Sequence, residues 1–368
     1  MTSRLSILHI GKFYPPDRGG IEAHLETLCR HHKDDFDLRV FVANRSRLTT
    51  DELIEGVPVT RFGTKLHVAG ASVTPALFTR LRDAKVDLIH FHAPNPPAAI
   101  AYLVSGASAP LVISWHSDIV RQRVLGAAFS PLMQWMLRRA RAVIVGSRNY
   151  LETSRDLTSH RDRAQVIPYG IDVADFDRVH QASVAAIRKR HGSPLVLAVG
   201  RLTRYKGFEY LIAAMRGVAA TLVVIGDGSE RDALERVAAS AGVADRVTFV
   251  GDVDDLAPWY QACDLFVLPS VERNESFGIV QAEAMACRKP VVNTQLTSGV
   301  PFVSQDGETG ITVPPRNADA LGHAINTLLS SPALAARYGA AGRHRVETLF
   351  DARDMSSKIA ALYRAIVH

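Results

Sequence analysis

The sequence is dominated by short apolar runs that alternate with segments of helical period, and this alternation limits the possible folds most strongly. Runs such as "LSILHIG" and "LVLAVGR" are apolar at successive positions, which is typical of strands buried on both faces of a sheet. Several runs end in Gly, Ser or Pro, where a ligand-facing loop would begin. Strands that alternate with helices predict parallel βα units and therefore an α/β fold.

Two series of such runs follow each other and predict two domains. Each half of the chain holds six strand candidates, and the stretch around residues 170–194 separates the two series. We predict two doubly wound, Rossmann-like domains over 1–180 and 181–350, with a helix over 351–368 that packs back on the first. Open parallel sheets bind ligands outside the carboxyl ends of their strands, so we expect a ligand in a cleft between two facing sheets.

Composition and cysteine spacing narrow the class of protein. With 368 residues, 47% of them hydrophobic and 22% charged, the chain resembles a globular protein and neither a disordered nor a fibrous one. Three widely spaced cysteines without a CxxC pair predict a reducing compartment, with neither a disulfide framework nor a zinc site. The apolar stretch 96–115 is interrupted by Ser105, Gly106 and Pro110, which favours a buried helix and strand over a membrane span. We therefore expect a cytoplasmic protein.

The charge is basic and unevenly distributed. The net charge is +6, and residues 1–185 hold 23 Lys and Arg against 18 Asp and Glu. A basic first half is compatible with an acidic or phosphorylated partner, and equally with a merely solvated surface. The segment "MLRRARA" (136–142) leaves two interpretations open: peripheral contact with anionic lipid, or a solvated helix end that complements the helix dipole. No nucleic-acid partner is predicted.

A loop in the second half carries two cations next to a helix start. Arg201 and Lys206 lie in "VGRLTRYKG", between a strand and a helix, with a glycine on either side. A guanidinium fork, an ammonium group and free N–H groups together suit a pyrophosphate, although a pair of solvated basic residues remains the alternative.

The stretch "NESFGIVQAEAMA" predicts a second contact with the same ligand. A helix is expected to start around residues 276–278. Gly278 allows close approach, so the N–H groups of Phe277, Gly278 and Ile279 could face an anion there. Glu275 and Glu283, on the order of 12 Å apart along a helix, would accept hydrogen bonds from hydroxyls of a transferred sugar and of a ribose. The alternative interpretation is that both are surface glutamates that flank a helix start and bind no ligand.

Weaker candidates occur elsewhere in the chain. Gly19 and Gly20 precede a helix and could offer N–H groups to a phosphate, and His116 follows a strand at the expected ligand edge. His90 and His92 have the same standing with less support. In "GDVDDL" a base-binding turn, with backbone groups of Gly251 and Val253, is preferred to a Mg²⁺ site because no third ligand is evident.

Taken together, the sequence resembles the retaining glycosyltransferases of family 4, which have the GT-B fold. The matching pieces run in order from residue 13 to residue 315: "FYPPDRGGIE", "HSD", "IPYGID", "VGRLTRYKG", "VIGDGSE", "NESFGIVQAEAMA", "KPVV" and "DGETGITVPP". This resemblance implies a hexosyltransferase that needs neither cofactor nor metal and uses a nucleotide-diphosphate sugar as co-substrate.

The resemblance also assigns roles to single residues. It implies that Arg201 and Lys206 bind the donor diphosphate, Glu283 the ribose and Glu275 the donor sugar. Gly20 would meet phosphate and His116 the sugar near the reacting centre. The acceptor hydroxyl would attack from the face that the nucleotide leaves, without a glycosyl-enzyme intermediate.

Two departures from the family pattern refine the expectation. Arg288 stands where the family usually has Gly after "AMAC", which puts that helix end in doubt. The segment "NTQLTSGVPFV" replaces a Gly-Gly segment and, with "RNESFG", resembles transferases of O-antigen and exopolysaccharide assembly that use GDP-mannose or GDP-rhamnose. We expect a GDP-sugar donor, with a UDP-sugar possible, and a lipid-linked or oligosaccharide acceptor at the inner face of the cytoplasmic membrane. A sugar-nucleotide 2-epimerase and a non-catalytic nucleotide-sugar-binding subunit are the competing hypotheses.

Overall fold

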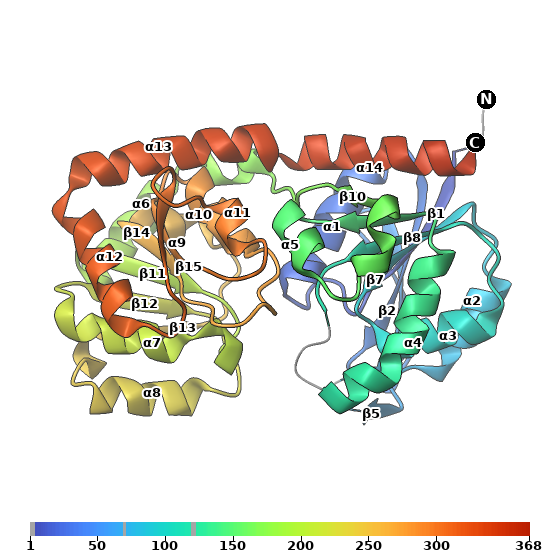
Figure 1. Cartoon of the computed structure of the whole chain (residues 1–368), viewed down its shortest axis with the longest axis horizontal. Coiled ribbons are helices and arrows are strands. Elements are labelled where there is room, and N and C mark those ends of the chain that lie inside the picture. Colours follow the sequence, from blue (N-terminus) through green and yellow to red (C-terminus); the bar gives the residue numbers. More distant parts are fainter. Residues whose placement is uncertain (1–3, 69–70, 119–122) are drawn as a thin grey trace. The chain divides into compact units, whose positions relative to one another are not determined.

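The computed structural model describes residues 4–68, 71–118 and 123–368, which form two compact units (Figure 1). The first unit comprises residues 1–170 and 352–368, and the second comprises residues 171–351. Each unit is built on its own mainly parallel sheet with helices on both faces. Each of the twelve predicted apolar runs contains a strand, which confirms the predicted α/β class.

The first unit has an eight-stranded sheet in the order β10-β9-β8-β7-β1-β2-β4-β3. Its strands are β1 (Ser6–Ile10), β2 (Asp37–Asn44), β3 (Thr50–Ile54), β4 (Val57–Gly63), β7 (Leu88–Ala93), β8 (Leu111–Trp115), β9 (Ala142–Val145) and β10 (Ala164–Val166). Only the edge pair β3–β4 is antiparallel among the described pairs of this sheet, and the sequence did not predict it. A short hairpin of β5 (Leu66–Val68) and β6 (Ala71–Val73) stands apart.

Helices cover both faces of the first sheet because its strands are apolar at successive positions. One face packs against α2 (Pro75–Asp83), α3 (Pro96–Ser105) and α4 (Arg123–Arg139), through residues such as Leu8 and Ile113. The other face packs against α1 (Gly20–His32) and α14 (Ala352–Val367), through residues such as Ile7 and Val112. A short helix, α5 (Arg148–Thr153), and the 3₁₀ helix η1 (Thr158–Arg163) lie between β9 and β10.

The second unit has a six-stranded sheet in the order β13-β12-β11-β14-β15-β16, with every described pair parallel. The strands are β11 (Leu195–Val199), β12 (Thr221–Ile225), β13 (Val247–Gly251), β14 (Leu265–Leu268), β15 (Val291–Thr294) and β16 (Gly310–Val313). The helices are α6 (Gln181–His191), α7 (Phe208–Ala214), α8 (Arg231–Ser240), α9 (Ala257–Ala262), α10 (Ile279–Ala286), α11 (Val300–Val303), α12 (Ala318–Ser330) and α13 (Pro332–Leu349). Short 3₁₀ turns connect them: η2 (Val173–Phe176), η3 (Arg204–Lys206), η4 (Met215–Gly217) and η5 (Ala244–Arg246).

The boundary between the units lies at Gly170 and Ile171, ten residues before the one expected at residue 180. Residues 171–180 are held by the second unit, because the guanidinium of Arg343 forms two hydrogen bonds to the carboxylate of Asp177, at 2.6 and 3.0 Å. Gln261 also donates to the carbonyl of Phe176. These hydrogen bonds attach residues 171–180 to the second unit. They join residues far apart in the sequence, so the composition of the segment does not reveal them.

The helix at the end of the chain belongs to the first unit. Helix α14 buries one apolar stripe, which includes Met355, Ile359 and Tyr363, against the face that also carries α1. His32 of α1 forms a 2.9 Å hydrogen bond with the carbonyl of Ser356. Repetition of apolar residues at helical spacing in "SSKIAALYRAIV" explains this packing.

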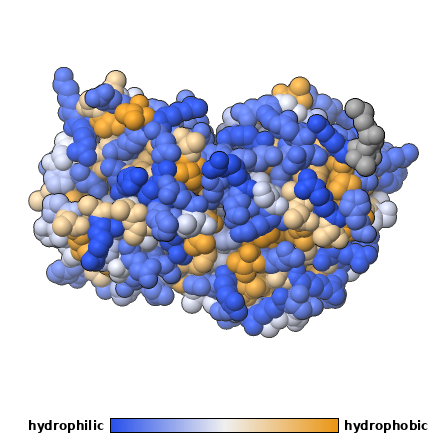
Figure 2. All heavy atoms as spheres, turned by 90° about the horizontal axis from the view of Figure 1, so that it is seen from above, coloured by the Kyte–Doolittle hydropathy of each residue, from blue (hydrophilic) through white to orange (hydrophobic). Residues whose placement is uncertain are grey.

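None of the helices formed by the described residues is both long and apolar enough to cross a membrane. The surface seen in Figure 2 is mostly hydrophilic, and its apolar residues form small separate patches.

Candidate active site

The candidate donor residues gather at the carboxyl edge of the second sheet. Strands β11 and β14 are parallel neighbours, so the loops that follow Val199 and Leu268 leave the sheet at the same edge. Lys206 ends the 3₁₀ turn η3 in the first loop, and Glu275 lies in the second. Two segments almost seventy residues apart are thereby brought together.

Lys206 and Glu275 form a buried ion pair. The distance from Lys206 Nζ to Glu275 Oε2 is 2.5 Å, and the two side chains are only 9% and 11% exposed. Ser270, which is fully buried, donates a 2.9 Å hydrogen bond to the same carboxylate oxygen. Burial is the largest single influence and acts to lower the pKa of Lys206, but the charges of Glu275 and Tyr205 and the hydrogen bond to Glu275 together outweigh it, so the net shift is upward. The ammonium group is therefore held charged at a water-poor position.

A glycine allows the two loops to approach this closely. Gly207 has a φ of +67°, and a Cβ at this residue would lie 2.3 Å from the carbonyl oxygen of Pro269. The N–H of Val271 donates to the carbonyl of Tyr205 at 2.8 Å, which ties the loops together. Only glycine tolerates both the left-handed backbone and the short approach.

Arg201, the second predicted cation, lies in the same loop as Lys206 and is exposed. Lys206 extends across the preceding glycine, since a Cβ on Gly200 would be 3.1 Å from Lys206 Nζ. The positive charge of Arg201 acts on the pKa of Lys206 in the downward direction, which shows that the two cations share one region. The structure therefore brings together Arg201, Lys206 and Glu275.

Glu283 lies on α10 and is held by a tyrosine that the sequence did not single out. The hydroxyl of Tyr260, on α9, donates a 2.7 Å hydrogen bond to Glu283 Oε2. Burial raises the pKa of Glu283, and the hydrogen bond from Tyr260 and the charge of Lys206 offset part of that shift. Burial and the neighbouring carboxylate together raise the pKa of Tyr260 well above its usual range.

The helix after Glu275 begins later than expected. Helix α10 starts at Ile279, and Gly278 caps it with a φ of 74°, whereas the sequence indicated a start at residues 276–278. Phe277 directly precedes the cap residue, and its ring is buried against Phe350, with ring centroids 5.7 Å apart. The prediction that the N–H groups of Phe277, Gly278 and Ile279 face an anion stays a prediction. The helical rise used to separate Glu275 from Glu283 consequently applies only from Ile279 onward.

The other predicted positions lie where parallel strands end. Gly251 ends β13 with a φ of 86°, and its carbonyl accepts a 2.9 Å hydrogen bond from the N–H of Gly226, which follows β12. Val253 lies two residues further and is half-buried. The base-binding role of Gly251 and Val253 stays a prediction.

Arg288 occupies the left-handed conformation that glycine usually takes after a helix. Helix α10 ends at Ala286, and Arg288 has a φ of 57°. The N–H of Arg288 donates to the carbonyl of Met285 at 2.9 Å, so the turn is preserved despite the substitution. The helix therefore ends in a left-handed turn of the usual kind, although Arg288 is strained in the conformation that glycine adopts more easily.

In the first unit, the predicted phosphate-facing glycines begin α1. Gly19 is the N-cap residue with extended backbone, and Gly20 is the first residue of the helix, so the helix starts at the pair itself. His116 directly follows β8, and its N–H donates to the carbonyl of Ala93 at the end of β7. The roles that the resemblance gives to Gly20 and His116, toward phosphate and sugar, stay predictions.

His116 belongs to a buried histidine cluster that the sequence revealed only in part. Its Nε2 lies 3.0 Å from Nδ1 of His92, whose Nε2 lies 3.2 Å from Nδ1 of His9. His90 lies level with His9 across the sheet and bonds Tyr363 and Ser114. The face covered by α1 and α14 therefore holds histidines from β1, from β7 and from the residue after β8, and α1 adds His24 and His32.

Burial keeps these imidazoles neutral. It lowers the pKa of His9 to about 3 and those of His24 and His32 to about 4, and it lowers the pKa values of His90, His92 and His116 well below the usual range. Positive charge on neighbouring histidines adds to several of these shifts.

The cluster predicts acid-sensitive stability. Folded-state pKa values below the unfolded value mean that the unfolded chain binds more protons, so the free energy of unfolding is highest above pH 6.5 and falls as the pH drops toward 4. Each histidine contributes a slope of up to about 1.4 kcal/mol per pH unit.

Urea denaturation between pH 7.5 and 4.5 measures the slope. His32→Gln should reduce it, and replacement of the exposed His323 by Gln should not; equal slopes in all three proteins would contradict the account.

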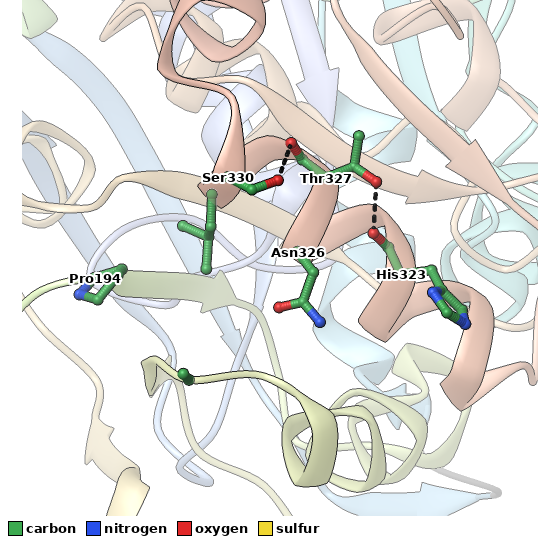
Figure 3. A pocket seen from close by; sticks show the side chains of 7 residues that line it. Pro194, His323, Asn326, Thr327 and Ser330 are labelled. Atoms are coloured by element: carbon green, nitrogen blue, oxygen red, sulfur yellow. Dashed lines mark hydrogen bonds between the residues drawn. The ribbon is translucent and has the colours of Figure 1, made fainter.

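A hollow of about 490 Å³ in the second unit does not belong to this site. It is lined by residues that include Pro194, His323 and Asn326, and Pro194 immediately precedes β11, at the amino edge of the sheet (Figure 3). The Thr327 and Ser330 hydroxyls in it donate to carbonyls of their own helix (Figure 3). Some of its polar groups are therefore already hydrogen-bonded within the protein. The hollow lies at the edge of the sheet opposite to the one that carries Lys206.

Both halves of the chain match known families. Residues 18–175 match the family described as Glycosyltransferase Family 4, and residues 179–345 match the family described as Glycosyl transferases group 1. D-rhamnosyltransferase WbpZ of Pseudomonas aeruginosa is 30% identical, over 95% of this chain and 93% of that protein. The chain belongs to glycosyltransferase family 4.

Other relatives and solved structures agree with the assignment. O-antigen chain mannosyltransferase C of Escherichia coli is 29% identical over 99% of both chains. A GDP-mannose-dependent phosphatidylinositol monomannoside mannosyltransferase of Mycolicibacterium smegmatis is 30% identical over 95% of this chain and 96% of that protein. Sucrose-phosphate synthase of Thermosynechococcus elongatus has a TM-score of 0.84 and 26% identity, over 98% of this chain and 99% of that chain. These results confirm the GT-B fold and a glycosyltransferase that uses a nucleotide sugar.

Proposed function

We propose that this glycosyltransferase moves mannose or rhamnose from a GDP-sugar to a glycan or lipid-linked acceptor in the assembly of a cell-surface polysaccharide. The observation that carries the proposal is the buried pair of Lys206 and Glu275, with Arg201 in the same loop, at the carboxyl edge of the second sheet. A bound diphosphate is stabilised by fixed cations, and sugar hydroxyls need groups that accept their hydrogen bonds. This edge offers the cations Arg201 and Lys206 and the acceptor Glu275.

Lys206 has donors left for a phosphate after it pairs with Glu275. An ammonium group carries three N–H donors, and the ion pair occupies one of them. Glu275 Oε2 accepts from both Lys206 and Ser270, whereas its Oε1 has no partner within the described part of the chain. We assign Lys206 and Arg201 to the donor diphosphate and Glu275 Oε1 to a hydroxyl of the donor sugar.

The chemistry is a transfer with retained configuration. The bond from the sugar C1 to the diphosphate oxygen breaks, the acceptor oxygen bonds to C1 from the same face, and the acceptor proton passes to the departing phosphate oxygen. Negative charge develops on that oxygen, where Arg201 and Lys206 would stabilise it. In this scheme no protein carboxylate attacks C1; Glu275 Oε2 stays with Lys206 and Ser270, and Oε1 accepts a hydrogen bond from the donor sugar.

We further propose that transfer does not depend on a metal at the diphosphate. In this assignment two cationic side chains occupy the place that a Mg²⁺ ion takes in other nucleotide sites. Among the described residues, the groups of His, Cys, Asp and Glu close enough to share an ion consist of residues of the first unit, and none of them includes a residue of the second.

The choice of GDP over UDP rests on one of the relatives described above. The mycobacterial relative named as GDP-mannose-dependent shares 30% identity, whereas a solved Anabaena protein in complex with UDP and glucose shares 21% and supports the fold alone. The relatives described above are transferases, which favours transfer over the 2-epimerase and the non-catalytic alternatives.

A panel of nucleotides tests the donor. GDP and GDP-mannose should raise the thermal unfolding temperature more than UDP, ADP or their sugars, because a ligand that binds only the folded state stabilises it. Glu283→Ala should weaken GDP binding about 10–100-fold, as expected for a lost hydrogen bond to a charged group. Tyr260→Phe removes the same internal hydrogen bond but keeps the carboxylate, and it should change GDP affinity less than about 3-fold.

Product analysis separates the alternatives. GDP-mannose incubated with a mannose-terminated acceptor should give an α-linked product by NMR, since retention preserves the donor configuration. A preference for UDP, a β-linked product, or conversion of the donor without acceptor would each contradict the proposed function.

Peripheral contact with an anionic membrane is also proposed, on the basis of a basic hollow of about 660 Å³ in the first unit. Its lining includes Arg138, Arg139, Arg141 and Arg163. Arg139 is oriented by Tyr102 and by the carbonyl of Ala107. Sedimentation should show binding to vesicles that contain phosphatidylglycerol, weaker in Arg138→Gln/Arg141→Gln and in high salt. Equal binding to neutral vesicles would refute an electrostatic contact.

A further inference from the structure

Three histidines of the first unit form a row of hydrogen-bonded rings. Nε2 of His116 lies 3.0 Å from Nδ1 of His92, and Nε2 of His92 lies 3.2 Å from Nδ1 of His9. The rings of His92 and His116 are nearly coplanar, with planes 11° apart and centroids 5.3 Å apart, so their contact is an in-line hydrogen bond. We call His9, His92 and His116 the histidine row.

The rings of the histidine row are neutral. All three side chains are at least 97% buried, and burial lowers their pKa values. A neutral imidazole carries one N–H and one lone pair, so a ring that accepts through one nitrogen must donate through the other. The direction of one hydrogen bond therefore sets the direction of the next, and the row has only two arrangements of its protons.

The His9 end of the row decides between these two arrangements. Nε2 of His9 is buried and has no hydrogen-bond partner among the described residues. If the bonds ran from His116 toward His9, this nitrogen would carry an unpaired N–H; in the opposite direction it carries only an unpaired lone pair. Buried N–H groups without a partner are rarer in proteins than unpaired acceptors. The favoured arrangement is therefore that His9 donates to His92 and His92 donates to His116.

The second nitrogen of His116 is the one left for a ligand. His116 directly follows β8, and its backbone N–H donates to the carbonyl of Ala93 at the end of β7, which fixes the residue at the carboxyl edge of the sheet. The rings of His24 and Tyr169 lie against its ring, with centroids 5.2 and 5.3 Å away. The bond to His92 occupies Nε2, and no residue in the described part of the chain forms a hydrogen bond with Nδ1.

We propose that His92 is a positioning residue that holds His116 in the Nδ1–H tautomer, so that His116 donates a hydrogen bond to a hydroxyl oxygen of the transferred sugar. The inference rests on the proposed function and on the assignment of His116 to that sugar. In this tautomer Nδ1 has no lone pair for a proton, so His116 does not act as the base that deprotonates the acceptor. This agrees with transfer of the acceptor proton to the departing phosphate oxygen.

The tautomer is measured in the full-length protein labelled with ¹⁵N-histidine, without substrate. Long-range ¹H–¹⁵N NMR spectra should show the proton of His116 on Nδ1, with the signal identified by its loss in His116→Gln. His92→Phe keeps a ring but cannot donate, so His116 should populate both tautomers. His92→Asn retains an amide donor near the position of Nδ1 and should keep the wild-type tautomer. A proton on Nε2 in the wild type would overturn the proposal, and this result needs no variant of His92 to fold.

Kinetics with GDP-mannose separate positioning from a purely structural role. His92→Phe should lower kcat/KM for transfer about 10-fold, as expected for one lost hydrogen bond, and should leave the affinity for GDP, which lacks the sugar, within about 2-fold. His92→Asn should restore kcat/KM to within about 3-fold of the wild type. In a His116→Ala background His92→Phe should have no further effect, because it acts through His116; losses that multiply would contradict the proposal.

Tyr363→Phe is the matched control. It removes a hydroxyl that is hydrogen-bonded to His90, a buried histidine of β7 outside the histidine row. The tautomer of His116 and kcat/KM should not change; a change in both as large as that of His92→Phe would overturn the specific role of His92. Because the tautomer is read without substrate, a wild type that is inactive with GDP-mannose would refute the proposed function, whereas the position of the proton would still decide the arrangement of the row.

Discussion

Replacing Lys206 by methionine is expected to lower kcat/KM for transfer by about 10²–10³-fold and the free energy of unfolding by about 3–5 kcal/mol. The catalytic loss follows from the proposed contact of Lys206 with the leaving diphosphate. The loss of stability follows from the burial of Glu275, whose carboxylate would keep Ser270 as a partner but lose its counter-charge. Steady-state kinetics with GDP-mannose and urea denaturation measure the two effects separately.

A double-mutant cycle distinguishes the two contributions. Glu275→Gln removes the charge with little change of shape, and Lys206→Met/Glu275→Gln removes both charges of the pair. We expect the double variant to recover most of the stability that Lys206→Met loses, because no unpaired charge remains buried. Transfer should stay as low as in the single variants. If the double variant recovered activity together with stability, the pair would be structural, and its role in transfer would be refuted.

Gly207→Ala should strongly destabilise the loops that carry Lys206 and Glu275. The new Cβ would lie 2.3 Å from the backbone oxygen of Pro269, on a residue with a φ of +67°. Because the obstacle is backbone, both loops must move, and we expect a loss of about 3–4 kcal/mol in unfolding free energy and of at least about 10-fold in GDP affinity.

Gly242→Ala is the matched control for Gly207→Ala. Gly242 has nearly the same φ, +68°, but no atom within 4 Å of the added Cβ, so the substitution isolates the backbone strain. We expect it to cost about 1 kcal/mol and to leave GDP affinity unchanged. Thermal denaturation of both variants measures the loss of stability, and calorimetric titration with GDP measures the affinity. Equal destabilisation would mean that backbone strain alone explains the requirement for glycine at residue 207.

The fold could be predicted because its strands carry a strong local signal. A run such as "LVLAV" is apolar at every position, since both faces of its strand are covered, and no neighbouring residue alters that pattern. The edge hairpin β3–β4 lacks the signal: β3 reads "TDELI" and is exposed along most of its length. Its turn depends on Glu55 and Gly56, both at positive φ, and a Glu-Gly pair is a weaker turn signal than Asn-Gly.

The candidate site could be predicted only where its residues share a sequence segment. Arg201 and Lys206 lie in one loop next to a helix, and that arrangement indicates phosphate binding by itself. The contact of Lys206 with Glu275 depends on the order of β11 and β14 in the sheet, which no local pattern gives. The start of α10 at Ile279 and the burial of the Phe277 ring against Phe350, 73 residues further along the chain, are likewise not given by the local sequence.

The histidine cluster shows the same limit more clearly. His90 and His92 are visible as a pair because strand residues two apart share a face, and the register then aligns His9 with His90. The partner of His90, Tyr363, lies 273 residues away on α14, and His24 lies on α1. A single sequence gives no reason to join these residues until the packing of both helices on one face of the sheet is known.

A crystal structure of the complex with GDP-mannose tests the central claim most directly. We predict diphosphate oxygens within hydrogen-bond distance of Arg201 and Lys206, a ribose hydroxyl on Glu283, and a mannose hydroxyl on Glu275. A nucleotide bound elsewhere, such as in the hollow beside Asn326, with Lys206 and Glu275 left in contact only with each other, would contradict the account.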